Sequence, residues 1–197
     1  MEANMRNEIG TERLVLRQLA LNDAAAFSKL AGDYDISKMT GSLPHPFPLY
    51  SAEFKIMYLR QQKRRGLAYP YAITVNGGEL IGVMDLFRSA PDTALEIGYW
   101  IGKPYWGQGL STEAAKAIIQ EAKDRLGVQA LMAGVFADNP ASLRVLEKLG
   151  FKTTGSEEMY FSMARMEKAR SVILRLDLET QQRAIPLNSG LKLVMSA

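Results

Sequence analysis

The sequence predicts an α+β fold with a mixed, mostly antiparallel central sheet of about six or seven strands, flanked by about four helices. Two β-rich runs, 71–75 and 79–87, flank the dipeptide signal Asn-Gly followed by glycine, which favours an antiparallel hairpin. A third run, 93–101, is followed by a helical pattern and by another strand, 128–136. That order predicts one parallel pair with a right-handed crossover.

The N-terminal third is expected to hold one strand and two helices. The run 13–19 reads as a strand, and amphipathic patterns follow at about 22–32 and 51–65. Between the helices lies GSLPHPFPLY (residues 41–50), whose prolines exclude a helix, so we expect a stiff loop there. This loop contains His45, the only histidine of the chain.

The C-terminal half should contribute two more helices and the remaining strands. Apolar residues recur every four positions over 110–126, and Gly127 is a typical stop after a helix. A shorter helix, 140–148, is predicted by Asn139 as N-cap and the proline that follows it. Strands are also expected near 159–163 and 172–178.

Composition excludes several classes of protein. With 47% hydrophobic and 23% charged residues, the chain should fold on its own, as a single domain over 11–178 followed by an ill-defined tail, 179–197. No apolar run approaches the roughly 20 residues that span a bilayer and the start lacks a signal-peptide core, so we expect a cytoplasmic protein with no membrane partner. The net charge of +3 forms no basic stripe, and no nucleic-acid partner is expected.

The absence of cysteine limits the chemistry that is available. It excludes disulfides, thiolate metal sites and a cysteine nucleophile. No cluster of metal-ligating residues stands out either, so no metal is expected. A group transfer should then use another nucleophile or go directly from donor to acceptor.

The stretch YWGQGLSTEA (residues 105–114) places two glycines directly before a helix. Gly107 and Gly109 allow positive φ and close approach to a ligand, and the helix start offers unpaired N–H groups and the positive end of its dipole. This favours an anion site; the alternative is a flexible loop before a helix capped by Ser111 or Thr112. Neither the P-loop nor the dinucleotide fingerprint fits the stretch.

Two separated motifs point to one family. LEIGYWIGKPYWGQGLSTEA (95–114) and NPASLRVLEKLGF (139–151) together resemble the acyl-coenzyme A site of the GNAT acyltransferases. The opening TERLVLRQL (11–19) and the later LPHPFPL (43–49) are similar to the RimJ/RimL-like branch, which acetylates ribosomal-protein N termini. The resemblance, over roughly 11–178, implies a GNAT fold with a splayed parallel pair and an acetyl-CoA-dependent N-acetyltransferase.

The resemblance also implies a set of coenzyme A contacts. The pyrophosphate would rest on backbone amides of the glycine loop, and the pantetheine arm would lie along the preceding strand. Trp106 and Ser111 depart from the family's polar first and small last loop residues, with little effect expected because backbone N–H groups bind the phosphates. The implied acetyl-CoA-binding residues are Trp100, Ile101, Trp106, Gly107, Gln108, Gly109, Leu110, Ser111, Asn139 and Ser142.

Glu96 is the candidate general base. Strand alternation places it on one face with Gly98 and Trp100, in an otherwise apolar strand. Several family members that the chain resembles carry a glutamate at this position as base, often through water. The alternatives are a carboxylate paired with a cation at the sheet surface, and a bulge that shifts the register.

The acid for the leaving thiolate is less clearly marked. Many relatives use a tyrosine in the helix after the asparagine, but Leu146 stands at that position. Ser142 looks like the serine that has this role in the ribosomal N-terminal acetyltransferases; alternatively, it bonds the backbone of its helix start. Tyr160 is a second candidate by position only.

The acceptor is expected to be an amine, either a protein N terminus or a small molecule such as an antibiotic, a polyamine or an amino acid. Its pocket should come from the two early helices, the 44–48 loop and the region 164–171. His45 is expected to be a turn or surface residue. A non-catalytic acyl-CoA sensor is the alternative from another class, and the chain is expected to be a monomer or a homodimer.

Overall fold

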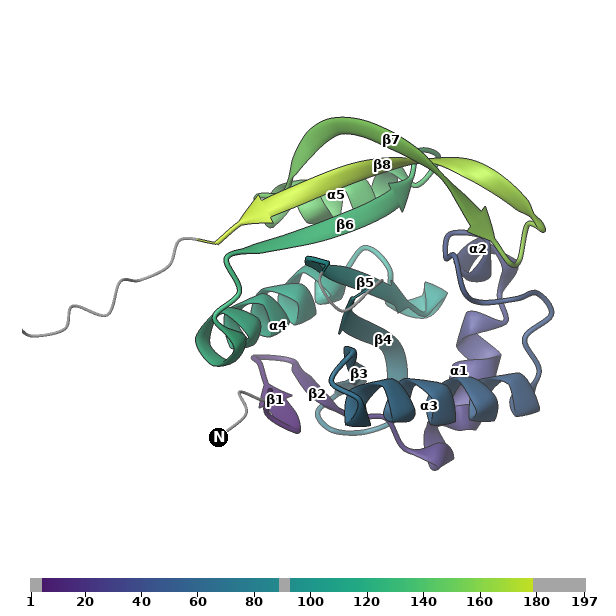
Figure 1. Ribbon diagram of the computed structural model, residues 1–197. Coiled ribbons are helices and arrows are strands. Elements are labelled where there is room, and N and C mark those ends of the chain that lie inside the picture. The colour runs from purple at the N-terminus through teal and green to yellow at the C-terminus, as the bar shows by residue number, and fades with distance from the viewer. Residues whose placement is uncertain (1–4, 89–92, 179–197) are drawn as a thin grey trace, which may run out of the picture.

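The structure is a computed structural model that describes residues 5–88 and 93–178; the predicted tail, 179–197, lies outside the described residues. One sheet runs through the molecule with the strand order β1-β2-β3-β4-β5-β6-β8-β7 (Figure 1). All neighbouring strands are antiparallel except β5 and β6. The strands are β1 Glu8–Gly10, β2 Leu14–Gln18, β3 Ala68–Val75, β4 Leu80–Phe87, β5 Leu95–Ile101, β6 Ala130–Phe136, β7 Lys152–Ser162 and β8 Glu167–Asp177.

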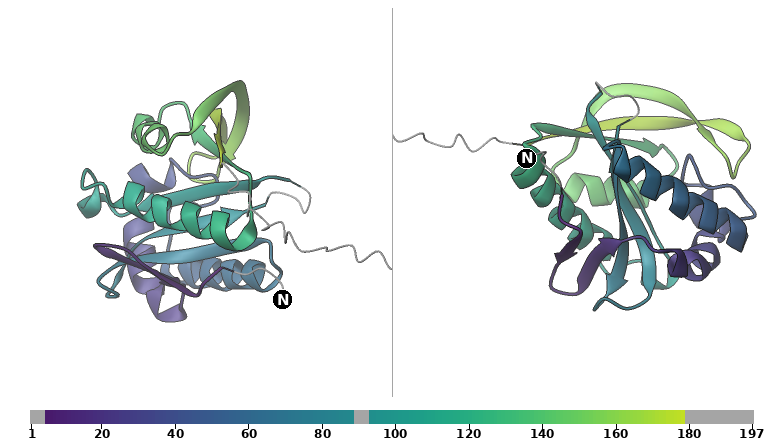
Figure 2. Two further views of the ribbon diagram at one scale, coloured as in Figure 1. Left: turned by 90° about the vertical axis from the view of Figure 1, so that its left-hand side faces the viewer. Right: turned by 60° about the horizontal axis from the view of Figure 1, so that its bottom comes forward.

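Helices cover both faces of the sheet, with α1 and α3 on one side and α4 on the other (Figure 2). The buried apolar residues accordingly form two clusters, one around Ile118 of α4 and Leu131 of β6, the other around Phe27 of α1 and Ile56 of α3. The helices are α1 Ala24–Ala31, α2 Tyr34–Ser37, α3 Leu49–Arg64, α4 Leu110–Leu126 and α5 Pro140–Lys148, with 3-10 turns at Leu21–Asp23 and Lys103–Tyr105.

The predicted α+β class, its four longer helices and its single parallel pair are confirmed. Asn76 and Gly77 both adopt positive φ, 50° and 75°, as the tight turn between β3 and β4 requires. The described sheet has eight strands because β1 adds an edge that the sequence pattern does not predict. Met5 and Ile9 are buried in the core, so the folded body includes residues before position 11.

The parallel pair is short. Its register joins Leu95 to Leu131 and Glu96 to Met132, and within the described chain the two strands do not pair beyond those positions. Yet β5 stays paired with β4 as far as Ile101, and β6 stays paired with β8 as far as Phe136. Beyond Glu96 and Met132, the facing edges of β5 and β6 therefore do not pair with each other, which is the splay that the family resemblance implies.

Candidate active site

The glycine loop forms an open cradle at the start of α4. Gly107 and Gly109 have φ values of 74° and 76°, in the left-handed region that side chains disfavour. Gly109 is the N-cap residue, and no side chain of the described chain caps this helix, so Ser111 and Thr112 do not act as caps. The first N–H groups of α4 are left for a ligand with negative charge.

Two residues just before β2, Thr11 and Arg13, bind this loop and the first turn of α4. The Arg13 side chain donates from Nη1 to the carbonyl of Gln108 at 3.0 Å and from Nε to Oε2 of Glu113 at 2.7 Å. Thr11 donates its hydroxyl to the other carboxylate oxygen of Glu113 at 2.6 Å. Burial opposes ionisation of Glu113, but the hydrogen bonds from Thr11 and Arg13 outweigh it, and the pKa of the carboxyl is lowered.

Three of the predicted cofactor residues lie at the end of β5 or just after it. Trp106 is 46% exposed and donates its indole N–H to the carbonyl of Ile101 at 2.7 Å, which fixes the turn between the strand and the cradle. The Ile101 side chain is buried in the core. Trp100 faces the opposite side of the sheet, where the centre of its ring lies 5.0 Å from the centre of the Phe27 ring.

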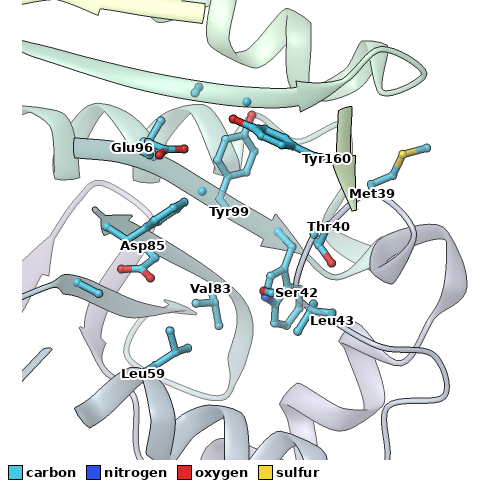
Figure 3. Close-up of a pocket in the computed structure, with 18 of the residues that line it drawn as sticks. Met39, Thr40, Ser42, Leu43, Leu59, Val83, Asp85, Glu96, Tyr99 and Tyr160 are labelled. Atoms are coloured by element: carbon cyan, nitrogen blue, oxygen red, sulfur yellow. The ribbon is translucent and has the colours of Figure 1, made fainter. Parts of the chain in front are cut away.

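A cavity of about 750 Å³ opens where β5 and β6 separate. Figure 3 shows the side chains that β4, β5, β7 and the loop after α2 project into it. The cavity brings together five residues singled out from the sequence. They are Glu96, Trp100, Asn139, Ser142 and Tyr160.

The residues that line this cavity agree only in part with those expected for the acceptor pocket. Both early helices line the cavity, through Phe27 of α1 and several side chains of α3, but the loop that lines it is 39–43 and not 44–48. From the region 164–171 only Ser171 reaches it. His45 is exposed, and its ring lies edge-on to a tyrosine 5.1 Å away, outside the cavity lining.

Glu96 sits at the last paired position before the splay. The β4–β5 register is continuous from Gly82 to Phe87, which excludes the bulge considered for β5, and Glu96 lies directly opposite Phe87. The predicted alternation is confirmed because Leu95 and Ile97 belong to the α4-side core, whereas Trp100 packs on Phe27 on the opposite face. Glu96 and the hydroxyl of Tyr160 point into the same space (Figure 3).

Tyr160 packs on a strand position where only glycine fits. A Cβ at Gly134 of β6 would lie 2.4 Å from Cε2 of the Tyr160 ring. Burial raises the pKa of Tyr160 to about 12, with further increases from Glu158 and Glu96. The phenol therefore stays protonated at neutral pH and is able to donate a hydrogen bond.

The start of α5 holds Ser142 in a defined orientation. Asn139 is the N-cap, as predicted: its Oδ1 accepts from the Ser142 N–H, and its Nδ2 donates to Ser142 Oγ, both at 3.1 Å. Because Oγ accepts from Asn139, its own proton points elsewhere. Leu146, which replaces the expected tyrosine, is 1% exposed and belongs to the core.

Sequence reasoning missed Tyr99. Its hydroxyl donates to the backbone carbonyl of Ser142 at 3.3 Å, and burial raises its pKa to about 12. This bond links the part of β5 that no longer pairs with β6 to the start of α5. Strand alternation puts Tyr99 on the face opposite to Glu96, so the pattern alone gives no signal that Tyr99 also lines the cavity and contacts α5.

Sequence reasoning also missed Asp85 and Lys55, which line the cavity from β4 and α3. Asp85 lies opposite Gly98, and its Oδ1 accepts the N–H of Tyr69 at 3.1 Å. Lys55 donates to Ser42 Oγ at 3.0 Å, and burial lowers its pKa. An aspartate inside the apolar run LIGVMDLF was the available signal for this part of the site.

The arrangement suits transfer from an anionic donor to a basic acceptor. The cradle can hold phosphates, the splayed edges can pair with an extended chain, and the carboxyl groups of Asp85 and Glu96 line the cavity. Among the described residues, no three histidine, aspartate or glutamate side chains gather as a metal site, and no helix has the length and apolarity to cross a bilayer. This fold and site define an acyltransferase.

Comparison with known proteins identifies the family. Residues 13–152, more than half of the chain, match the family model described as acetyltransferase (GNAT) domain. The chain therefore belongs to the GNAT acetyltransferases and is an N-acetyltransferase of that family. Its likeness to the RimJ/RimL-like branch is supported as well, by the structural and sequence relatives that follow.

Three matches illustrate how far the similarity extends. An uncharacterized N-acetyltransferase, p20, of Bacillus licheniformis is 28% identical over 147 residues, covering 74% of this chain and 82% of the relative. A ribosomal-protein-serine acetyltransferase of Escherichia coli is 32% identical over 93 residues, 47% of this chain and 51% of that protein. RimJ of Mycobacterium smegmatis, solved with a coenzyme A disulfide, superposes with a TM-score of 0.76 at 20% identity, over 89% and 90% of the two chains.

Proposed function

We propose that this protein transfers the acetyl group of acetyl-CoA directly to an amine, the α-amine of a protein N terminus, with Glu96 as general base and Ser142 as the acid for the thiolate. The observation that carries the proposal is the position of Glu96. It stands at the last paired residue of the splayed strands, in the same cavity as Ser142. A single domain, predicted over 11–178 and extended by strand β1 before it, acting in the cytoplasm as a monomer or homodimer, is part of the proposal.

Acetyl-CoA would bind along one continuous path. The pyrophosphate fits the cradle of Gly107 and Gly109, where positive φ turns backbone N–H groups outward and α4 adds its positive end. The pantetheine arm would pair with the backbone of β5 beyond Glu96, as an added strand in the splay. The thioester would then lie beside Trp100, facing Asn139 and Ser142 across the cavity.

The residues of the chain then manage protons and position. Glu96 would take a proton from the acceptor nitrogen, directly or through water, as the nitrogen attacks the thioester carbon. Ser142 would donate to the leaving sulfur, because Asn139 occupies an acceptor site on Oγ and leaves its proton available. With no cysteine in the chain, no thiol acyl-enzyme is possible and a direct attack is the simpler route.

The relatives support a protein N terminus as acceptor. The Escherichia coli protein is named for ribosomal-protein serine, and the cavity is larger than a short alkylamine needs. A small amine such as a polyamine or an amino acid is the competing acceptor within the same chemistry.

The test is release of coenzyme A thiol, with the acetylated product identified by mass spectrometry. Purified protein is mixed with acetyl-CoA and, in separate reactions, peptides with free N termini, the same peptides blocked at the N terminus, polyamines, amino acids and aminoglycosides. We expect release only with free N-terminal peptides and acetylation of the α-amine. Release with small amines alone would refute the protein acceptor, and no amine-dependent release would refute the proposed function.

A further inference from the structure

Asp85 is an acidic residue in the middle of a central strand. It pairs across the β4–β5 ladder with Gly98, and is therefore a diagonal neighbour of Glu96 on the same face. Diagonal residues of an antiparallel pair are about 7 Å apart, so both carboxyl groups border one space, and both line the cavity. Figure 3 shows Asp85 below Glu96, on the side of α3. Aspartate is depleted in strands, and packing does not account for it here.

Hydrogen bonds occupy only part of the Asp85 carboxyl. Oδ1 accepts from the Tyr69 N–H, whereas Oδ2 has no hydrogen-bond partner within the described residues. Lys55, the cation that influences it from α3, is directed instead to Ser42, and its ammonium lies 5.4 Å from the centre of the Tyr58 ring. One oxygen of a cavity-lining carboxyl is thus left for a molecule that enters the cavity.

Charged and titratable groups from several elements share this space. They are Lys55, Tyr58 and Arg65 from the α3 side, Arg88 at the end of β4, Glu96 and Tyr99 from β5 and Tyr160 from β7. Burial raises the pKa of Asp85 to about 7, against the opposing effects of the Tyr69 N–H and of Lys55. The carboxyl therefore gains and loses its proton near neutral pH.

Acetylation of an amine that arrives as an ammonium ion requires two proton transfers. An α-amine or lysine amine arrives mainly as an ammonium ion at neutral pH or below, and an ammonium nitrogen has no lone pair for attack. It must lose one proton before attack and a second one as the amide forms. Only two acidic residues of the described chain line the cavity, Asp85 and Glu96.

We propose that Asp85 accepts the first proton, from the ammonium form of the acceptor, and that Glu96 accepts the second; this inference rests on the proposed function. In the first step an N–H bond breaks and an O–H bond forms at Oδ2 of Asp85, which leaves a neutral amine. In the second the nitrogen lone pair forms the C–N bond, the C–S bond breaks, and the nitrogen loses its second proton to Glu96. The thiolate takes one proton from Ser142, which is reprotonated by Glu96, and Asp85 returns its proton to solvent.

The experiment separates the two carboxyl groups by the acidity of the acceptor. Asp85→Asn keeps an oxygen for the Tyr69 N–H and removes only the ionisable group. Its thiol-release rate at pH 7 is measured with a peptide that begins with alanine and with the same peptide beginning with trifluoroalanine, whose amine is neutral without help from a base. Asp177→Asn, an exposed aspartate at the end of β8, is the matched control.

We expect Asp85→Asn to lower kcat/KM by about 5- to 10-fold for the alanine peptide, because roughly a tenth of its α-amine is already neutral at pH 7. The loss should be less than about 2-fold for the trifluoroalanine peptide, while Glu96→Gln impairs both. Equal losses with both peptides, or none, would overturn the role of Asp85. If the wild-type protein acetylates neither peptide, the proposed function is refuted, and this inference is refuted with it. Carbon-13 NMR of the Asp85 carboxyl adds a readout without acceptor: a midpoint near 7 is expected, and an ordinary aspartate midpoint near 4 would overturn the inference.

Discussion

Arg13 on the approach to β2 and Glu113 in the first turn of α4 form an ion pair with a nitrogen–oxygen distance of 2.7 Å. The same guanidinium holds the carbonyl of Gln108, so the pair ties the glycine cradle to the sheet. Because the Arg13 side chain is 47% exposed, the pair itself contributes little to global stability, and its main effect should be on the order of the loop.

Replacing Arg13 should therefore weaken coenzyme A binding more than it weakens the fold. We expect Arg13→Ala to raise the Kd for coenzyme A about 10-fold and to lower the free energy of unfolding by less than about 1 kcal/mol. Calorimetric titration and urea unfolding measure the two quantities. Arg60→Ala, an exposed arginine on α3, is the control, and an unchanged Kd in Arg13→Ala would contradict the bracing role.

The cradle glycine Gly109 offers a second test, because the backbone strain of an added side chain can be separated there from steric overlap. A Cβ at Gly109 would meet Arg13 Nη2 at an ordinary 3.8 Å, so the cost of Gly109→Ala is its φ of 76°. We expect about 1 kcal/mol of lost stability and at least about 10-fold weaker coenzyme A binding. Gly10→Ala, where a Cβ meets nothing within 4 Å, should change neither quantity. Equal behaviour of the two variants would refute the backbone cradle.

Gly134 tests the acceptor side of the cavity without touching the cradle. An added methyl would lie 2.4 Å from the Tyr160 ring, which has to move. We expect Gly134→Ala to raise the KM for the amine about 10-fold while the Kd for coenzyme A stays within about 2-fold of its original value. Steady-state kinetics at saturating acetyl-CoA gives the KM. An unaffected KM would mean that Tyr160 does not border the acceptor.

The raised pKa of Asp85 has a consequence for stability that requires no substrate. Because the folded pKa of about 7 exceeds the ordinary aspartate value near 4, the folded protein binds more protons than the unfolded chain between these values, and stability falls as pH rises through that window. Asp85→Asn removes this cost. We expect its gain over wild type to be up to about 3 kcal/mol larger at pH 8 than at pH 5.

Urea unfolding at the two pH values measures that difference. The tyrosine N–H keeps an oxygen partner in Asp85→Asn, so hydrogen bonding is matched between the proteins. A gain that is the same at both pH values would show that the carboxyl is ionised in the folded state throughout.

The sequence was most informative where local rules decide the structure. The Asn-Gly turn, the glycine stop after α4 and the Asn139 cap all follow from backbone preferences of single residues, and the structure has each of them. The strand–helix–strand order predicted the parallel pair, and the two motifs, 95–114 and 139–151, predicted the family.

Tertiary contacts decided the parts that sequence reasoning missed. Strand β1 is three residues long and is defined by its pairing with β2, so no periodic pattern marks it. Asp85 and Lys55 come from elements far apart in the chain and meet only in the folded cavity. The loop 39–43, and not the expected proline loop, lines the cavity; it follows α2, a short helix that the sequence pattern did not predict. Roles of Glu96 and Ser142 stay predictions.

The central claim is that Glu96 is the base for direct acetylation of an amine. Its most direct test is the pH dependence of kcat for Glu96→Gln at saturating acetyl-CoA, with the Kd for coenzyme A measured alongside. The account predicts a loss of about 100-fold at neutral pH that shrinks as pH rises and hydroxide removes the proton that the nitrogen loses on attack, with an unchanged Kd. A variant that keeps the wild-type kcat across the whole pH range would contradict it.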